Sequence, residues 1–148
     1  MKNSWEWPQC SGMMPVARAA HAAAKIGHYV YVFGGRNGPI RMNDMYALNM
    51  KTFEWIQIKA NDEHHPVKGR SWHSLTPISN NMLVLYGGFS MDNIPLNDCW
   101  LFNTDHCTWQ QVILPFDRPR LWHSACLSSF GESKYINNNN FIILIIII

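Results

Sequence analysis

The stretch VYVFGGRNGPIRMNDMYALNMKTFEW, residues 30–55, is followed at residues 83–109 by LVLYGGFSMDNIPLNDCWLFNTDHCTW. Both stretches carry a double glycine, an Asn-Asp pair and a late tryptophan in the same order, and an Arg-x-x-His motif precedes each of them, at Arg18 and at Arg70. By subtraction, corresponding landmarks lie 52 to 54 residues apart, and a third Arg-x-x-His motif begins at Arg120. A period of about 50 residues indicates a module that stacks against copies of itself.

Each copy contains four short segments with the pattern of β-strands. Alternating bulky residues bounded by turn residues predict strands at 21–25, 29–33, 44–49 and 53–59 in the first copy, and at 72–78, 82–86, 98–103 and 108–114 in the second. Residues 4–7 resemble the end of the first copy, so they are predicted to be the last strand of a preceding module. The turn at Asn80-Asn81 is expected to use the left-handed backbone that asparagine tolerates.

Composition favours a β-rich core and argues against nucleic-acid binding and against a membrane span. Of the 148 residues, 47% are hydrophobic, 13% are aromatic and only 15% are charged, and seven tryptophans are available to fill the space between sheets. The net charge is +2 without any polybasic run, which argues against nucleic-acid binding. The apolar run at 141–148 is far shorter than a membrane span.

The cysteines and the N-terminus indicate a reducing compartment. Residues 1–10 lack the apolar core of a secretory signal. The four cysteines have no zinc-site spacing and are predicted to be free thiols: Cys10, Cys99, Cys107 and Cys126. The expected localisation is therefore the nucleus and the cytoplasm.

Four-stranded modules with a double glycine and a late tryptophan resemble kelch repeats, the blades of β-propellers. The resemblance implies an all-β fold, a kelch β-propeller fragment with two complete four-stranded blades plus a strand of the preceding and of the following blade. It assigns residues 1–10 to the last strand of a preceding blade, 18–59 and 70–114 to two kelch blades, and 120–130 to the start of a further blade.

The number of blades and the tail predict an incomplete propeller. A propeller needs at least about four blades, so the chain is expected either to be a fragment or to assemble with other chains. Residues 131–148 are predicted to be a low-complexity tail that is either disordered or an artefact of the gene model. Its Ile-rich run would be an aggregation hazard if it were exposed.

Strand directions in such a blade bring two sets of loops to one end, where binding residues usually lie. Residues present in every copy are expected to serve the repeat, as the arginines and histidines of the Arg-x-x-His motifs do. Arg36 and Arg41 are not matched by arginine in the second copy, and Ser71, Trp72 and Trp122 lie on the same predicted face. Two guanidinium groups, a hydroxyl and aromatic walls predict a carboxylate pocket. The spacing alone equally allows arginines that only solvate a loop.

Several stretches closely resemble the kelch-domain substrate receptors of cullin-2 ubiquitin ligases, kelch domain-containing proteins 1 and 2. They are residues 18–21, 33–36, 41–44, 69–77, 92–95 and 119–126. The resemblance implies recognition of the C-terminal peptides of client proteins, with a glycine end. Arg36, Arg41 and Ser71 would hold the terminal carboxylate, and Trp72 and Trp122 would form the pocket walls. The elongin/cullin-2 complex is an expected partner only if the C-terminal region that contacts it exists.

Two other functional classes are open. A general kelch interaction scaffold with no ligase role is the main alternative, and replacing Arg41 by Glu separates the two because a degron receptor would lose all its clients together. Kelch-type oxidases hold copper with Tyr, His and Cys ligands, but no such cluster is expected on the shared loop face. We therefore expect no enzyme activity, no metal and no cofactor.

Overall fold

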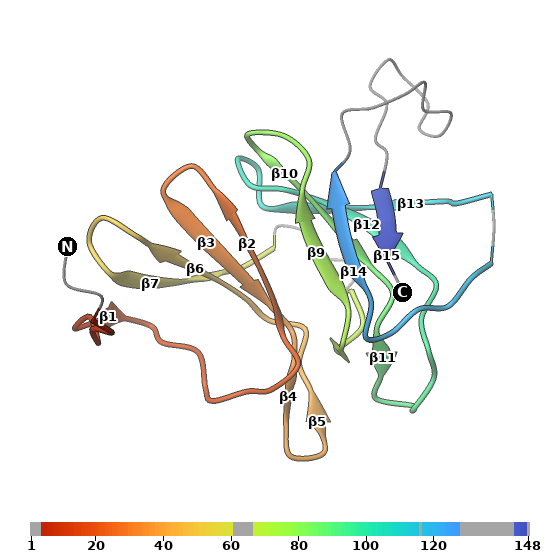
Figure 1. Cartoon of the computed structure of the whole chain (residues 1–148), viewed down its shortest axis with the longest axis horizontal. Helices are drawn as coiled ribbons and strands as arrows, with labels where there is room; N and C mark the ends of the chain where they lie inside the picture. The colour runs from red at the N-terminus through yellow and green to blue at the C-terminus, as the bar shows by residue number, and fades with distance from the viewer. Residues whose placement is uncertain (1–3, 61–66, 116, 128–143, 148) are drawn as a thin grey trace.

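The structure is a computed structural model that describes residues 4–60, 67–115, 117–127 and, as a strand, 144–147. Every regular element in these residues is a β-strand, and the two large sheets lie side by side (Figure 1). The predicted all-β fold is confirmed. In the described part of the chain, no helix has the length and apolar character needed to cross a membrane.

The first module forms a sheet that matches its prediction closely. Its strands are β2 (Ala22–Ile26), β3 (Tyr29–Phe33), β6 (Met45–Asn49) and β7 (Glu54–Ile58), and they pair antiparallel in the order β7-β6-β3-β2. A short strand, β1 (Ser11–Gly12), pairs parallel to the outer edge of β7. Each strand of the module ends within about one residue of its predicted end, because the alternation of bulky residues stops at turn residues.

The second module repeats this order with β9 (Ser74–Pro77), β10 (Met82–Tyr86), β12 (Cys99–Asn103) and β13 (Thr108–Val112). The pairs β9–β10, β10–β12 and β12–β13 are all antiparallel. The strand predicted at 72–78 starts later than expected, because Trp72 has a φ of 58° and so cannot continue an extended strand. The strand predicted at 108–114 also ends earlier than expected.

The third module contributes β14 (Ser124–Leu127), which lies beside β9. The hydroxyl of Thr76 in β9 donates to the carbonyl of Ala125 at 3.3 Å. β14 pairs antiparallel with β15 (Leu144–Ile147), in the place that β3 has beside β2. Of the predicted tail, 131–148, only 144–147 are described, so the assignment of the tail as a whole stays a prediction.

The strand predicted at residues 4–7 is not observed. Residues 4–10 have no regular structure, and the first strand is β1. The last strand of a blade pairs with the third strand of that blade, and no such partner for residues 4–7 is among the described residues. The assignment of 1–10 to a preceding blade therefore stays a prediction.

The turn between β9 and β10 lies where it was predicted, but its mechanism differs. Neither Asn80 nor Asn81 is among the residues with a positive φ. Instead, the backbone N–H of Asn81 donates to the Ser79 hydroxyl at 3.3 Å, and the Asn81 amide donates to the Asp105 carboxylate at 2.8 Å. Asparagine is used here for the hydrogen bonds of its side chain rather than for a left-handed backbone.

The main hydrophobic core fills the space between the two sheets. Its central members are Tyr31, Phe33, Met45 and Ala47 from the first module, and Leu75, Leu83, Leu85, Trp100 and Phe102 from the second. The Trp109 ring lies 5.2 Å from the Phe33 ring and 4.8 Å from the Phe102 ring, so it fills the wedge between the modules. Both modules are needed to bury this surface, as the repeat predicts.

The double glycines allow the inner edges of neighbouring modules to approach closely. The N–H of Gly35 donates to the carbonyl of Arg70 at 2.8 Å, and a Cβ built on Gly34 would lie 2.8 Å from the same oxygen. In the second module, a Cβ on Gly87 would lie 2.4 Å from the carbonyl oxygen of Arg120. Any side chain at these positions would push the next module away from its neighbour.

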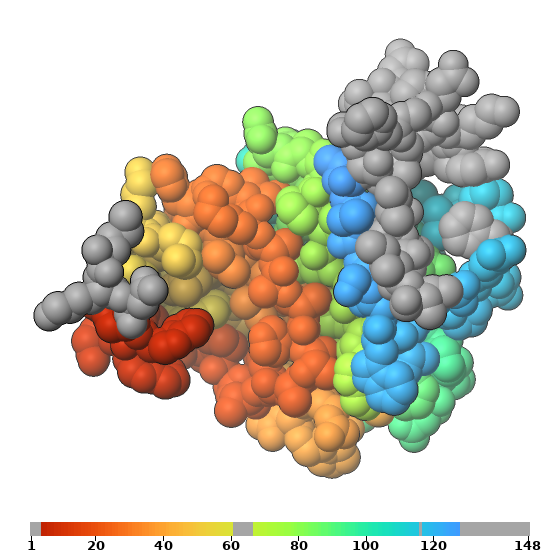
Figure 2. All heavy atoms as spheres, viewed as in Figure 1, coloured from red at the N-terminus to blue at the C-terminus, as the bar shows by residue number. Residues whose placement is uncertain are grey.

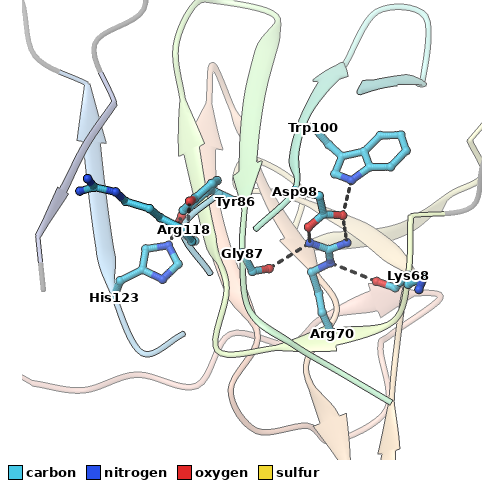
Figure 3. Close-up of polar contacts among 9 residues, drawn as sticks. Lys68, Arg70, Tyr86, Gly87, Asp98, Trp100, Arg118 and His123 are labelled. Atoms are coloured by element: carbon cyan, nitrogen blue, oxygen red, sulfur yellow. Dashed lines mark hydrogen bonds and ion pairs between the residues drawn. The ribbon is translucent and has the colours of Figure 1, made fainter. Parts of the chain in front are cut away.

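A buried ion pair anchors the second module (Figure 3). The Arg70 side chain has no exposed surface, and its two terminal nitrogens donate to the two oxygens of Asp98 at 2.6 and 2.7 Å. Arg70 also donates to the carbonyls of Gly87 at 2.9 Å and Lys68 at 3.1 Å, and the Trp100 indole donates to Asp98 at 2.6 Å. Burial alone would raise the pKa of Asp98, but the hydrogen bonds and charge of Arg70 outweigh it and lower that pKa.

The first module contains the same ion pair at the same repeat position. Arg18 donates to both oxygens of Asp44, at 2.6 and 2.9 Å, and to the carbonyl of Gly34 at 2.9 Å. The arginines of the first two Arg-x-x-His motifs therefore hold their own modules together. Arg120, in contrast, donates to the carbonyl of Pro119, and no acidic side chain in the described part of the chain pairs with it.

The histidines of the second and third motifs are buried between modules. His73 is only 6% exposed, and its ring lies 5.5 Å from the Phe33 ring in an edge-to-face arrangement. Burial, together with the charge of Arg70, lowers the pKa of His73 to about 3. The His123 ring shares a hydrogen bond of 2.9 Å with the Ser74 hydroxyl, and burial lowers the pKa of His123 too.

The low pKa of His73 predicts a loss of stability in mild acid. In the unfolded chain this side chain has the ordinary pKa of 6.5, so below that pH the unfolded state binds a proton that the folded state does not bind until about pH 3. His73 alone should lower the free energy of unfolding by up to about 1.4 kcal/mol for each pH unit in that window. Urea titrations from pH 7 to 4 on the wild-type chain and on His73→Gln measure it. The variant should show the flatter dependence; equal slopes would contradict the assignment.

Candidate functional site

Four loop segments meet at one end of the strands, and we call this end the loop rim. They are the hairpin of β4 (Arg36–Asn37) and β5 (Ile40–Arg41), the short strands β8 (Arg70–Ser71) and β11 (Phe89–Ser90), and residues 120–122. The β4–β5 hairpin and β11 lie at the lower edge of Figure 1, opposite the β2–β3 and β9–β10 turns. Figure 2 shows the orange hairpin next to the green and blue atoms of the later modules.

Arg36 and Arg41 face each other across the hairpin. They are direct partners in the β4–β5 register, so their side chains lie on the same face of it. The guanidinium carbon of Arg36 lies 5.5 Å from the centre of the Trp72 ring, and that of Arg41 lies 5.9 Å from it. Arg41 is also 4.7 Å from the Phe89 ring. Two like charges therefore share one indole, an arrangement that stacking stabilises and mutual repulsion opposes.

Ser71 lies beneath Arg41. Its hydroxyl oxygen accepts a hydrogen bond of 3.1 Å from Nε of Arg41, and the residue has no exposed surface. The backbone N–H of Arg41 donates to the sulfur of Met91 at 2.8 Å. The structure thus places Ser71 against the arginine rather than toward solvent, and in this geometry its direct contact is with the guanidinium. Its donation to a bound carboxylate stays a prediction.

Trp72 and Trp122 occupy the same position in successive modules. Their φ angles are 58° and 55°, and Ala20, the equivalent residue of the first module, has 56°. The N–H of Trp72 donates to the Ala20 carbonyl at 2.9 Å, and the N–H of Trp122 donates to the Trp72 carbonyl at 3.1 Å. The left-handed conformation costs a bulky residue about 1–3 kcal/mol, and these bonds between modules hold it in place.

The two indoles form a continuous aromatic surface at the rim. Their ring centres are 5.1 Å apart at an angle of 68°, and Trp122 is 72% exposed. The Phe89 ring lies 6.0 Å from the Trp72 ring on another side. Of the five residues singled out from the sequence, Arg36 and Arg41 both lie near the Trp72 ring, Ser71 hydrogen-bonds with Arg41, and Trp122 joins them through Trp72.

Sequence comparison between the copies missed two members of this cluster. Phe89 stands at the repeat position of Arg36, and neither Phe89 nor Met91 was predicted to be a site residue. Phe89 reaches Arg41 because β11 pairs with β8, which sets Phe89 opposite Ser71. The sequence signal that could have found Phe89 is its repeat position, since it is equivalent to Arg36 and equivalent residues of a repeat take equivalent places; Arg36 pairs with Ala19 as Phe89 pairs with Ser71.

The charges of the rim suit an anion. In the described part of the chain, the ion pairs are those of Arg18 and Arg70, and no acidic side chain pairs with Arg36 or Arg41. Guanidinium groups bind carboxylates through paired, charge-assisted hydrogen bonds, and the nearby rings exclude water from one side. The described residues contain no group of three or more His, Cys, Asp or Glu residues that could hold a metal ion.

Known proteins resemble this chain over most of its length. Residues 1–136 match the family model described as the KLHDC2/KLHL20/DRC7 Kelch-repeats domain. Over 140 residues the chain is 47% identical to Kelch domain-containing protein 1 of Homo sapiens, and this match covers 88% of this chain and 34% of that protein. Over 129 residues it is 46% identical to Kelch domain-containing protein 2 of Bos taurus, which covers 86% and 31% respectively. The chain thus spans about a third of the length of these curated relatives.

Because the arginines have different surroundings, replacing them should lower the free energy of unfolding by different amounts. Arg18→Gln breaks the part-buried pair with Asp44 and should lower the free energy of unfolding by about 2–4 kcal/mol. Arg36→Gln removes a like charge and a stacking contact whose effects offset each other, so the change should stay within about 0.5 kcal/mol. Urea denaturation of both variants makes the comparison. A loss for Arg36→Gln as large as that for Arg18→Gln would mean that Arg36 serves the fold.

Proposed function

We propose that the loop rim of this chain, which belongs to the family of the KLHDC2/KLHL20/DRC7 Kelch-repeats domain, binds the free C-terminal carboxylate of client proteins. The chain is a protein-interaction domain homologous to kelch domain-containing proteins 1 and 2. The observation that carries the proposal is the pair of guanidinium groups, Arg36 and Arg41, held together over one indole without an acidic partner among the described residues.

Electrostatics favours an anionic ligand over a neutral one. Two cations on the same face of a two-residue hairpin repel each other, and an anion placed between them replaces that repulsion with two attractions. A carboxylate offers two oxygens, which suits one guanidinium group on each. The Arg41 side chain is held by Ser71 and Phe89, so little conformational freedom is lost on binding.

The aromatic surface supports a polypeptide ligand with a small last residue. Trp72 lies over both arginines, so the space next to the carboxylate is restricted, and Trp122 continues the wall away from it. A glycine end leaves room beside the guanidinium groups, and a bulky last side chain would meet the indole. The glycine preference itself comes from the family resemblance.

The wider proposal is a substrate receptor of a cullin-2 ubiquitin ligase, acting in the nucleus and cytoplasm. Its partners would be C-terminal peptides of clients and, through a region outside the described blades, the elongin/cullin-2 complex. Such a receptor recognises its ligand and catalyses no reaction, so it needs no cofactor. The alternative is a general kelch interaction scaffold without a ligase role, which would bind its partner through another surface.

Titration with short peptides tests the proposal. A peptide ending in Gly-Gly with a free carboxylate, its amidated form, and a version ending in Phe would be added to the 15N-labelled chain at up to millimolar concentration. The free carboxylate should shift the backbone signals of the loop rim and bind at least about tenfold more tightly than the amide, because the charge-assisted contacts are lost on amidation. Binding should be weak, since a few modules form only part of a ring.

Matched charge reversals identify the site. Arg41→Glu should abolish binding of the free carboxylate, whereas Lys51→Glu, at an exposed turn on the opposite end of the sheet, should leave it unchanged. Equal binding of the free and amidated peptides, or binding that survives Arg41→Glu, would refute the receptor and favour the scaffold.

A further inference from the structure

A second recessed site lies between the two modules, at the end of the strands opposite the loop rim. It has a volume of about 470 Å³ and is lined by both modules. We call it the interblade cavity. In Figure 1 its surroundings, the β2–β3 turn and the β9–β10 turn, lie at the upper edge of the sheets. A volume in this range is sufficient for a small ligand or a long side chain.

The floor of the interblade cavity is apolar and aromatic. Ile56 and Ile58 of β7 line it, and Ile56 remains 39% exposed although it faces the second module. The Tyr29 and Tyr31 rings lie 6.3 Å apart along one wall. Burial raises the pKa of Tyr31, so its phenol stays protonated at neutral pH and the wall is uncharged. This surface suits an aliphatic stem and offers aromatic faces to a cation.

The mouth of the cavity carries a carboxylate. Asp105 has the only carboxylate among the described lining residues, and it lies in the exposed turn after β12. One of its oxygens accepts a hydrogen bond from the Asn81 amide at 2.8 Å, and no Lys, Arg or His of the described chain forms an ion pair with it. The hydroxyl of Thr104, next to it, donates to the carbonyl of Asn81 at 3.2 Å, so the two turns at the mouth are joined by hydrogen bonds.

These features favour a cation, whereas the loop rim favours an anion. A carboxylate at the mouth, tyrosine rings on a wall and an aliphatic floor together match a side chain with an apolar stem and a positive head. We propose that the interblade cavity receives an arginine or lysine side chain of a partner protein. The chain would then contact an anionic group at one end of its blades and a cationic group at the other.

The test uses amino-acid amides as probes of one side chain. N-acetyl-arginine amide would be titrated into the 15N-labelled 148-residue chain, and N-acetyl-citrulline amide, which has nearly the same shape without the charge, serves as its control. Neither probe carries a carboxylate, so neither engages the loop rim as a client C-terminus would. The arginine probe should give saturable shifts at Tyr31, Thr104 and Asp105, and the citrulline probe should bind at least about threefold more weakly.

A charge-neutral substitution locates the contact. Asp105→Asn keeps an oxygen that accepts from Asn81, and it should weaken the arginine probe about fivefold, the effect of one exposed ion pair. Asp92→Asn, at an exposed position after β11, should leave the affinity unchanged. Equal affinity for arginine and citrulline, shifts outside the cavity, or no saturable shift would overturn the proposal. The citrulline comparison needs no variant and decides the matter even if Asp105→Asn does not fold.

Discussion

Each double glycine donates a backbone hydrogen bond to the first residue of the next Arg-x-x-His motif, and this contact sets the distance between neighbouring modules. The Gly35 N–H donates to the Arg70 carbonyl, and a side chain at Gly34 or Gly35 would collide with neighbouring backbone. This contact sets Arg36, the next residue of one module, close to Ser71, the next residue of the other. The packing of neighbouring blades and the formation of the loop rim therefore depend on the same hydrogen bond.

The arginines divide into two groups according to what surrounds them. The side chains of Arg18 and Arg70 are buried, and each donates two hydrogen bonds to an aspartate. These bonds fix the loop between the second and third strands of each module. Arg36 and Arg41 stack on Trp72 and have no acidic partner in the described part of the chain. The first set therefore serves the fold, and the proposed carboxylate contact rests on the second.

The features that could be predicted from the sequence are those set by short-range patterns. The first module's strands end within about one residue of their predicted ends, because alternation and turn residues are short-range signals. The convergence of Arg36, Arg41 and Ser71 also followed from strand direction. The left-handed conformation of Trp72, the burial of Ser71 and the contact of Phe89 with Arg41 were not predicted, because they result from hydrogen bonds and strand pairs between modules. The interblade cavity likewise exists only once two sheets are packed together.

A double-mutant cycle measures directly the proposed contact between a guanidinium of the loop rim and the terminal carboxylate of a bound polypeptide. The cycle combines Arg41→Gln in the chain with amidation of a Gly-Gly-ended peptide, and compares the four affinities. If the two groups touch, the losses should not add, and the coupling energy should be about 2 kcal/mol. A coupling energy near zero, with each change acting independently, would show that the arginine and the carboxylate do not meet.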